Sequence, residues 1–123
     1  DKIGACGPTV AVLAFTFVTG GIVAASAEAI AANFGRLALA AFLLHVFGFG
    51  LGYLVTKLFR FDETIARTVS IEVGMQNGGM AAALAKQHFA TMPLAAAAGV
   101  FSGVMQNIIG GLLASWWKRR TSK

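Results

Sequence analysis

Three polar side chains lie among glycines in an otherwise apolar stretch of the sequence. They are Glu72, Gln76 and Asn77, within SIEVGMQNGGM at positions 70–80. If this stretch crosses a membrane, a charge near the bilayer centre costs about 2.5 kcal/mol or more on insertion scales. Such a residue needs a partner or a water-filled cavity, and by default it marks an ion or substrate pathway.

The glycines in the same stretch weaken a continuous helix. Gly74, Gly78 and Gly79 each cost about 1 kcal/mol relative to alanine in a helix interior. We therefore expect the helix to unwind between Val73 and Gly79. Free polar backbone is tolerated at membrane depth only where protein or water satisfies it. Many secondary transporters build their ion and substrate sites from such broken helices.

Oxygen ligands in this stretch suit sodium, a hard cation. Glu72 supplies negative charge, and the carbonyls of Val73 and Met75 with the Gln76 side chain can complete part of a shell. Asn77 stands where a second half-helix would begin, and a helix N-terminus favours an anionic group. The alternative is a helix kinked by glycine, in which Glu72 is protonated or paired with a base on another span.

The composition places this chemistry in a membrane protein. Of the 123 residues, 57% are hydrophobic and 12% are charged, with a mean hydropathy of +0.73. Soluble domains carry about a quarter charged residues. The chain has one cysteine, which excludes an intramolecular disulfide and a Cys-x-x-Cys metal site. No nucleophile and base pair is apparent, so we do not expect an enzyme.

Four apolar segments are long enough to cross a bilayer, for which about 20 helical residues are needed. They lie at 9–27, 37–54, 68–85 and 92–117. We expect helices at 37–60, at 63–89 with the break near 73–79, and at 92–117. The first two spans should be separated at Asn33, Gly35 and Arg36. Asp62 is a candidate N-cap, and Pro93 falls in the first turn of the last helix.

The basic residues indicate one orientation. Cytoplasmic loops are enriched in Lys and Arg, and Trp116 and Trp117 suit an aromatic belt at that interface. Only Arg36 and Lys86 fall on the outer side if the C-terminus is cytoplasmic. Bases at the ends of apolar runs indicate topology and argue against binding to nucleic acid. The eight basic residues that fall on the cytoplasmic side in this orientation are Lys2, Lys57, Arg60, Arg67, Lys118, Arg119, Arg120 and Lys123.

Two segments resemble a known family. Glu-Val-Gly-Met-Gln-Asn at 72–77, followed by a small-residue helix and a His-Phe end at 81–89, resembles the bile acid:sodium symporter (BASS) family. The segment FSGVMQNIIGG at 101–111 is similar to the family's last helix. The resemblance implies about ten spans in two inverted repeats. This chain would be the C-terminal half, with 1–36 as a panel-domain helix and loop. Residues 37–123 would be core-domain helices with a basic cytoplasmic tail.

The resemblance also implies a site. It places two sodium ions where the broken helix crosses its counterpart in the missing half, with Glu72 as a ligand to both. Val73, Met75 and Gln76 would ligate one of them. The substrate cavity would be lined by Asn77 together with Gln106 and Asn107, and several family members carry His where this chain has Gln106.

The predicted function is sodium-coupled symport of an organic anion such as a bile acid, a keto acid or a pantothenate-like acid. Its partners would be that anion, the lipid bilayer and the N-terminal half of the same transporter, in a bacterial inner membrane. Two alternatives stay open. One is a proton- or sodium-linked exchanger on a related inverted-repeat fold, and the other is a non-transporting membrane assembly fragment.

Two further features favour packing over chemistry. Gly-x-x-x-Gly spacing occurs at Gly48 and Gly52 and at Gly99 and Gly103, and such spacing lets helices approach closely. We interpret both pairs as packing seams rather than dimer interfaces. His45 lies on an apolar face, and we interpret it as a satisfied packing residue rather than a ligand.

Overall fold

The computed structural model describes residues 2–121, with side chains from 7 to 120 except position 15, and these residues form five α-helices. The side chain of Lys2 and all of Lys123, both counted for the orientation, lie outside the described residues. The helices are α1 (Lys2–Ala25), α2 (Ala27–Leu58), α3 (Glu63–Gly74), α4 (Gly78–His88) and α5 (Pro93–Thr121). No strand occurs in the described part of the chain.

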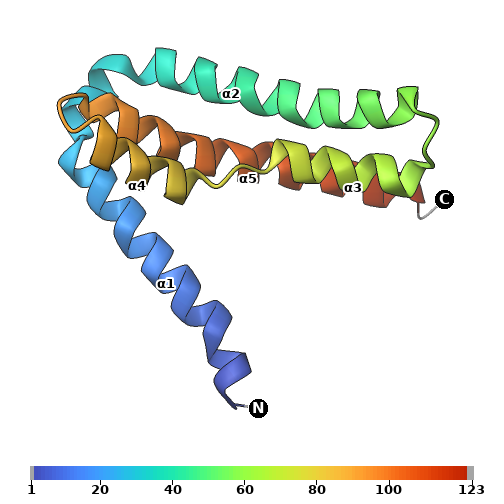
Figure 1. Ribbon diagram of the computed structural model, residues 1–123, viewed down its shortest axis with the longest axis horizontal. Helices are drawn as coiled ribbons and strands as arrows, with labels where there is room; N and C mark the ends of the chain where they lie inside the picture. The colour runs from blue at the N-terminus through green and yellow to red at the C-terminus, as the bar shows by residue number, and fades with distance from the viewer. Residues whose placement is uncertain (1, 122–123) are drawn as a thin grey trace.

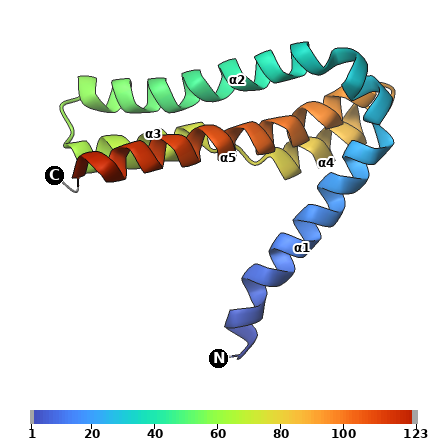
Figure 2. The same ribbon diagram turned by 180° about the vertical axis from the view of Figure 1, so that it is seen from behind.

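Figures 1 and 2 show two layers of helices with α1 extending away from them. The long helix α2 lies along α3 and α5, and α4 packs on the first half of α5. The far end of α1 joins the others through Ile22, which packs with Ala82, Ala96 and Val100. Most large apolar side chains face outward, including Phe17 and Leu58, which are 88% and 79% exposed. An apolar exterior of this kind suits lipid or further protein.

Three helices among the described residues are long and apolar enough to cross a membrane, at Gly7–Ala25, Ala27–Leu58 and Pro93–Arg120. Helices α3 and α4 have 12 and 11 residues, so each is shorter than the roughly 20 residues a single span needs. The fourth predicted span would require α3 and α4 together, so the count of four spans stays a prediction.

The predicted separation of the first two spans is wrong. Asn33, Gly35 and Arg36 lie inside α2, and α1 gives way to α2 at Ser26 instead. The Asn33 side chain donates to the Ala29 carbonyl at 3.0 Å, one turn back, which leaves the helix intact. At Ser26 the backbone N–H is shared between two carbonyls at 3.1 and 3.2 Å, so the helix direction changes with little loss of hydrogen bonding.

The other helix ends agree with the local sequence. Asp62 caps α3 by accepting from the Ile65 N–H at 2.9 Å, and Pro93 is the first residue of α5, as predicted. Arg60 has a φ of 61°, a left-handed conformation that closes the C-terminal end of α2. The Phe61 N–H reaches back to the Thr56 carbonyl at 3.3 Å.

The glycine pairs are packing seams, as predicted. A Cβ atom at Gly52 would meet the Ser70 Cα and the Val69 carbonyl of α3 at 3.0 Å. A Cβ atom at Gly99 would meet the Ala82 nitrogen of α4 at 2.7 Å. These close approaches hold α2 against α3 and α5 against α4, and they place the segment between α3 and α4 beside both α2 and α5.

Candidate functional site

The helical backbone stops between α3 and α4, over residues 75–77. Met75 is extended, with φ −90° and ψ 111°, and its N–H still bonds to the Ile71 carbonyl at 2.8 Å. Asn77 begins α4 by accepting from the Met80 N–H through Oδ1 at 2.9 Å. The helix-free stretch is thus narrower than the predicted 73–79, because the glycines at 74 and 78 stay within the helices.

His45 of α2 holds the end of α3. Its side chain is fully buried, with Nδ1 2.9 Å from the Gly74 carbonyl and Nε2 2.7 Å from the Ser102 Oγ of α5. Since a carbonyl can only accept, Nδ1 carries the proton and Nε2 accepts from the serine hydroxyl. The interpretation of His45 as a satisfied packing residue is confirmed, and it ties together α2, α3 and α5.

Gln106 of α5 holds the next turn of the chain. Its Oε1 accepts from the Gln76 N–H at 2.6 Å, and the residue is 9% exposed. The Gln76 side chain in turn donates from Nε2 to the Val73 carbonyl at 2.8 Å. Gln106 was predicted at the substrate cavity, and the structure places it against the backbone of the helix-free stretch.

Glu72 behaves differently from these buried residues. It is exposed on α3, and among the described residues no hydrogen bond or ion pair involves its carboxylate. It lines a shallow surface hollow between α3 and α5, whose other lining residues are Arg67, Thr68, Ile71, Ala114 and Trp117.

The predicted residues therefore fall into two groups. Val73 and Gln76 contact each other at the end of α3. Asn77 and Asn107 are exposed residues, and within the described part of the chain the Asn107 amide donates to the Gly103 carbonyl one turn back, at 2.9 Å. The role of His45 in holding the helix-free stretch was missed, because nothing in its local sequence indicates which backbone group it reaches.

The oxygen-rich character of this region fits sodium. The described residues contain no group of three or more His, Cys, Asp or Glu that could hold a metal. The region offers one carboxylate, side-chain amides and backbone carbonyls, of which those of Val73 and Gly74 already accept hydrogen bonds from side chains. Carbonyl and carboxylate oxygens are the donors that hard cations prefer.

The apolar helices and the outward-facing apolar side chains define an integral membrane protein. No protein-family model matches the chain. It is 39% identical over 116 residues to the Arabidopsis thaliana protein named "Probable sodium/metabolite cotransporter BASS1, chloroplastic". It is 36% identical over 120 residues to the rice protein named "Probable sodium/metabolite cotransporter BASS2, chloroplastic". It is 34% identical over 117 residues to the Bacillus subtilis protein named "Uncharacterized sodium-dependent transporter YocS".

These alignments cover 94%, 98% and 94% of this chain but only 29%, 28% and 36% of the relatives. The chain belongs to the bile acid:sodium symporter family, and it spans about a third of the length of these relatives. These relatives are named as transporters or cotransporters.

Proposed function

We propose that this chain is the C-terminal part, with the last four transmembrane helices, of a sodium-coupled symporter that carries an organic anion. The observation that carries the proposal is the unpaired Glu72 carboxylate next to the helix-free stretch 75–77. The names of the relatives support sodium as the coupled ion. In this proposal α3 and α4 cross the bilayer together, as one helix broken midway, within a ten-helix inverted-repeat fold. Residues 1–36 belong to the panel domain and 37–123 to the core domain.

The sodium ligands in this proposal are Glu72, the carbonyls of Val73 and Met75, and Gln76. The Gln76 side chain donates to the Val73 carbonyl, so the two residues are already held close together. Glu72 contributes the negative charge, and the missing half of the transporter contributes the rest of the shell. The bound sodium ion would neutralise the Glu72 carboxylate, which has no partner among the described residues.

Three amides face the organic anion in this proposal. Asn77 caps α4 through Oδ1, which leaves its amide nitrogen to donate at a helix N-terminus that favours negative charge. Asn107 is exposed on α5. Gln106 uses Oε1 to hold the Gln76 N–H, so it links the sodium ligands to the substrate side. A keto acid, a pantothenate-like acid or a bile acid would meet this requirement for a carboxylate.

The proposed orientation puts the C-terminus in the cytoplasm, in a bacterial inner membrane. The bases Lys118, Arg119 and Arg120 directly follow the last apolar helix. This orientation can be tested in intact cells by adding a C-terminal tag that contains a cysteine and labelling that cysteine chemically. Labelling of the tag by a membrane-impermeant reagent in unbroken cells would contradict it.

Uptake into proteoliposomes tests the function. The full-length protein should accumulate a labelled organic anion when sodium is outside, and potassium should not replace it. Glu72→Gln should reduce sodium-driven uptake at least tenfold, whereas Glu28→Gln, an exposed carboxylate in the first turn of α2, should not. Uptake by Glu72→Gln equal to that of the unmodified protein would exclude the proposed role. Uptake driven by a pH gradient and indifferent to sodium would favour the proton-linked exchanger.

A further inference from the structure

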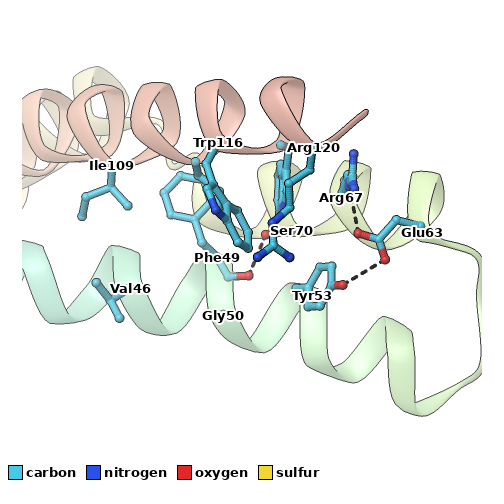
Figure 3. A pocket seen from close by; sticks show the side chains of 12 residues that line it. Val46, Phe49, Gly50, Tyr53, Glu63, Arg67, Ser70, Ile109, Trp116 and Arg120 are labelled. Carbon is cyan, nitrogen blue, oxygen red and sulfur yellow. Dashed lines mark hydrogen bonds and ion pairs between the residues drawn. The ribbon is translucent and has the colours of Figure 1, made fainter. Parts of the chain in front are cut away.

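A cavity of about 390 Å³ lies between α2, α3 and α5, near the C-terminal end of α5. It forms because α3 and α5 each pack along α2 but hardly touch each other. Figure 3 shows side chains from all three helices around it. Its volume falls in the range of about 300–1,000 Å³ that is usual for pockets that bind small molecules.

One end of the cavity is apolar. It is lined there by Val46 and Phe49 of α2 and by Ile109 and Leu113 of α5. The Ser70 hydroxyl in the same wall already donates to the Phe49 carbonyl at 2.7 Å, so it offers no free donor. This end can accept a hydrocarbon chain without leaving a polar group unsatisfied.

The other end carries charges and aromatic rings. Arg120 lies over the Trp116 ring at 4.4 Å, and Figure 3 shows both reaching from α5 toward α2. Arg67 bonds to Glu63 at 2.8 Å, and Lys57 lies 3.6 Å from the same carboxylate. Lys57 does not line the cavity, whereas Glu63, Arg67 and Arg120 do. The lining therefore has two guanidinium groups and one carboxylate, an excess of positive charge at this end.

The charged and apolar ends of the cavity lie at different depths along the membrane-spanning helices. The charged end lies where the apolar segments of α2 and α5 stop, at Leu58 and Arg120. The apolar end lies two to three turns deeper along the same helices. Tyr and Trp are enriched where hydrocarbon meets headgroups, and Tyr53 and Trp116 line the cavity at this level.

The cavity is distinct from the proposed transport site. On α5, the lining residues Ile109, Leu113 and Trp116 follow Asn107 by intervals that turn the helix by roughly half a circle. They therefore lie on the opposite face of α5 from Asn107. Gln106 shares their face of α5, but it does not line the cavity, and its Oε1 accepts from the Gln76 N–H. A ligand in this cavity would not occupy the place proposed for the transported anion.

We propose that this cavity binds an anionic phospholipid. The phosphate lies against Arg67 and Arg120, the upper part of one acyl chain lies against Ile109 and Leu113, and the headgroup edge packs on Trp116. Basic pockets between transmembrane helices are known to take the headgroups of anionic lipids. The lipid would hold α3 at its fixed distance from α5. This inference does not depend on the proposed transport function.

Native mass spectrometry of the full-length protein in detergent, titrated with dioleoylphosphatidylglycerol or dioleoylphosphatidylcholine, tests this site. Phosphatidylglycerol should bind at least about fivefold more tightly, since one basic group near an anionic surface contributes roughly that factor. Arg120→Gln should remove about fivefold of that affinity. Arg119→Gln is the matched control, because Arg119 is exposed on the same turn and does not line the cavity.

Two further measurements separate a lipid from a free anion. Ile109→Trp should fill the apolar end and abolish the preference for phosphatidylglycerol while both arginines remain. Glycerol phosphate without acyl chains should not compete at concentrations that exceed the lipid a hundredfold. The proposal is overturned if both lipids bind equally, if Arg120→Gln and Arg119→Gln behave alike, or if glycerol phosphate competes fully. Sodium-driven uptake is measured in a separate assay, so a failure of the lipid-binding proposal can be distinguished from a failure of the transport proposal.

Discussion

Replacement of His45 by phenylalanine tests how the helix-free stretch is held. Phenylalanine keeps a flat ring of similar size but removes both nitrogen atoms. The Gly74 carbonyl then loses its donor and the Ser102 hydroxyl loses its acceptor. Both groups lie in a part of the structure where His45 itself is fully buried, so water cannot easily replace the imidazole.

The expected cost follows from these two bonds. A buried polar group left without a partner costs about 1–3 kcal/mol. The Ser102 hydroxyl can turn to a carbonyl one turn back in its own helix, so most of the cost comes from the Gly74 carbonyl. We expect His45→Phe to lower the free energy of unfolding by about 2 kcal/mol.

Chemical denaturation of the full-length protein in detergent measures this cost. His88→Phe is the control, since His88 is exposed at the end of α4 and exposed substitutions usually stay within about 0.5 kcal/mol. A double-mutant cycle with Ser102→Ala should give a coupling energy of about 1 kcal/mol, within the range for residues in one network. If His45→Phe were as stable as His88→Phe, or if the cycle were additive, the proposed role of His45 would be refuted.

Four further substitutions follow from the same geometry. Gly78→Ala should destabilise the protein by about 1–3 kcal/mol, because its Cβ would lie 2.5 Å from a backbone oxygen of α5. Gly111→Ala, with nothing within 4 Å, should be neutral or stabilise by up to about 1 kcal/mol; equal melting temperatures for the two variants would contradict this. Asp62→Ala removes a cap and should cost about 1 kcal/mol, measured by the same denaturation. Gln106→Leu leaves the Gln76 N–H without its acceptor. It should reduce the free energy of sodium binding by more than it reduces the free energy of unfolding. An unchanged sodium affinity would count against a role of Gln106 in holding the sodium ligands.

Several helix ends were predicted correctly from the sequence, because each depends on residues that are close together along the chain. The Asp62 cap depends on a side chain that reaches three residues along the chain. Pro93 at the start of α5 depends only on a missing N–H. The packing role of Gly48 and Gly52 follows from spacing along one helix face, and the structure adds only which helix they meet.

The errors and omissions have a different cause. Polar residues near Asn33 suggested a loop, but in a helix an asparagine can satisfy its side chain on the carbonyl one turn back. The contacts of His45 and Gln106 with the helix-free stretch join residues 29 and 30 positions apart. No spacing rule within one helix can predict such contacts, because they depend on how α2 and α5 pack against α3.

Sodium-dependent thermal stabilisation of the full-length protein tests the central claim most directly. Unfolding would be followed in sodium and in potassium at equal ionic strength, for the unmodified protein, Glu72→Gln and Glu28→Gln. A ligand that binds only the folded state stabilises it by about 2.7 kcal/mol at one hundred times its dissociation constant. We predict a rise in melting temperature specific to sodium that is lost in Glu72→Gln and kept in Glu28→Gln. A sodium effect that persists in Glu72→Gln, or its absence from the unmodified protein, would contradict a cation site at the break between α3 and α4.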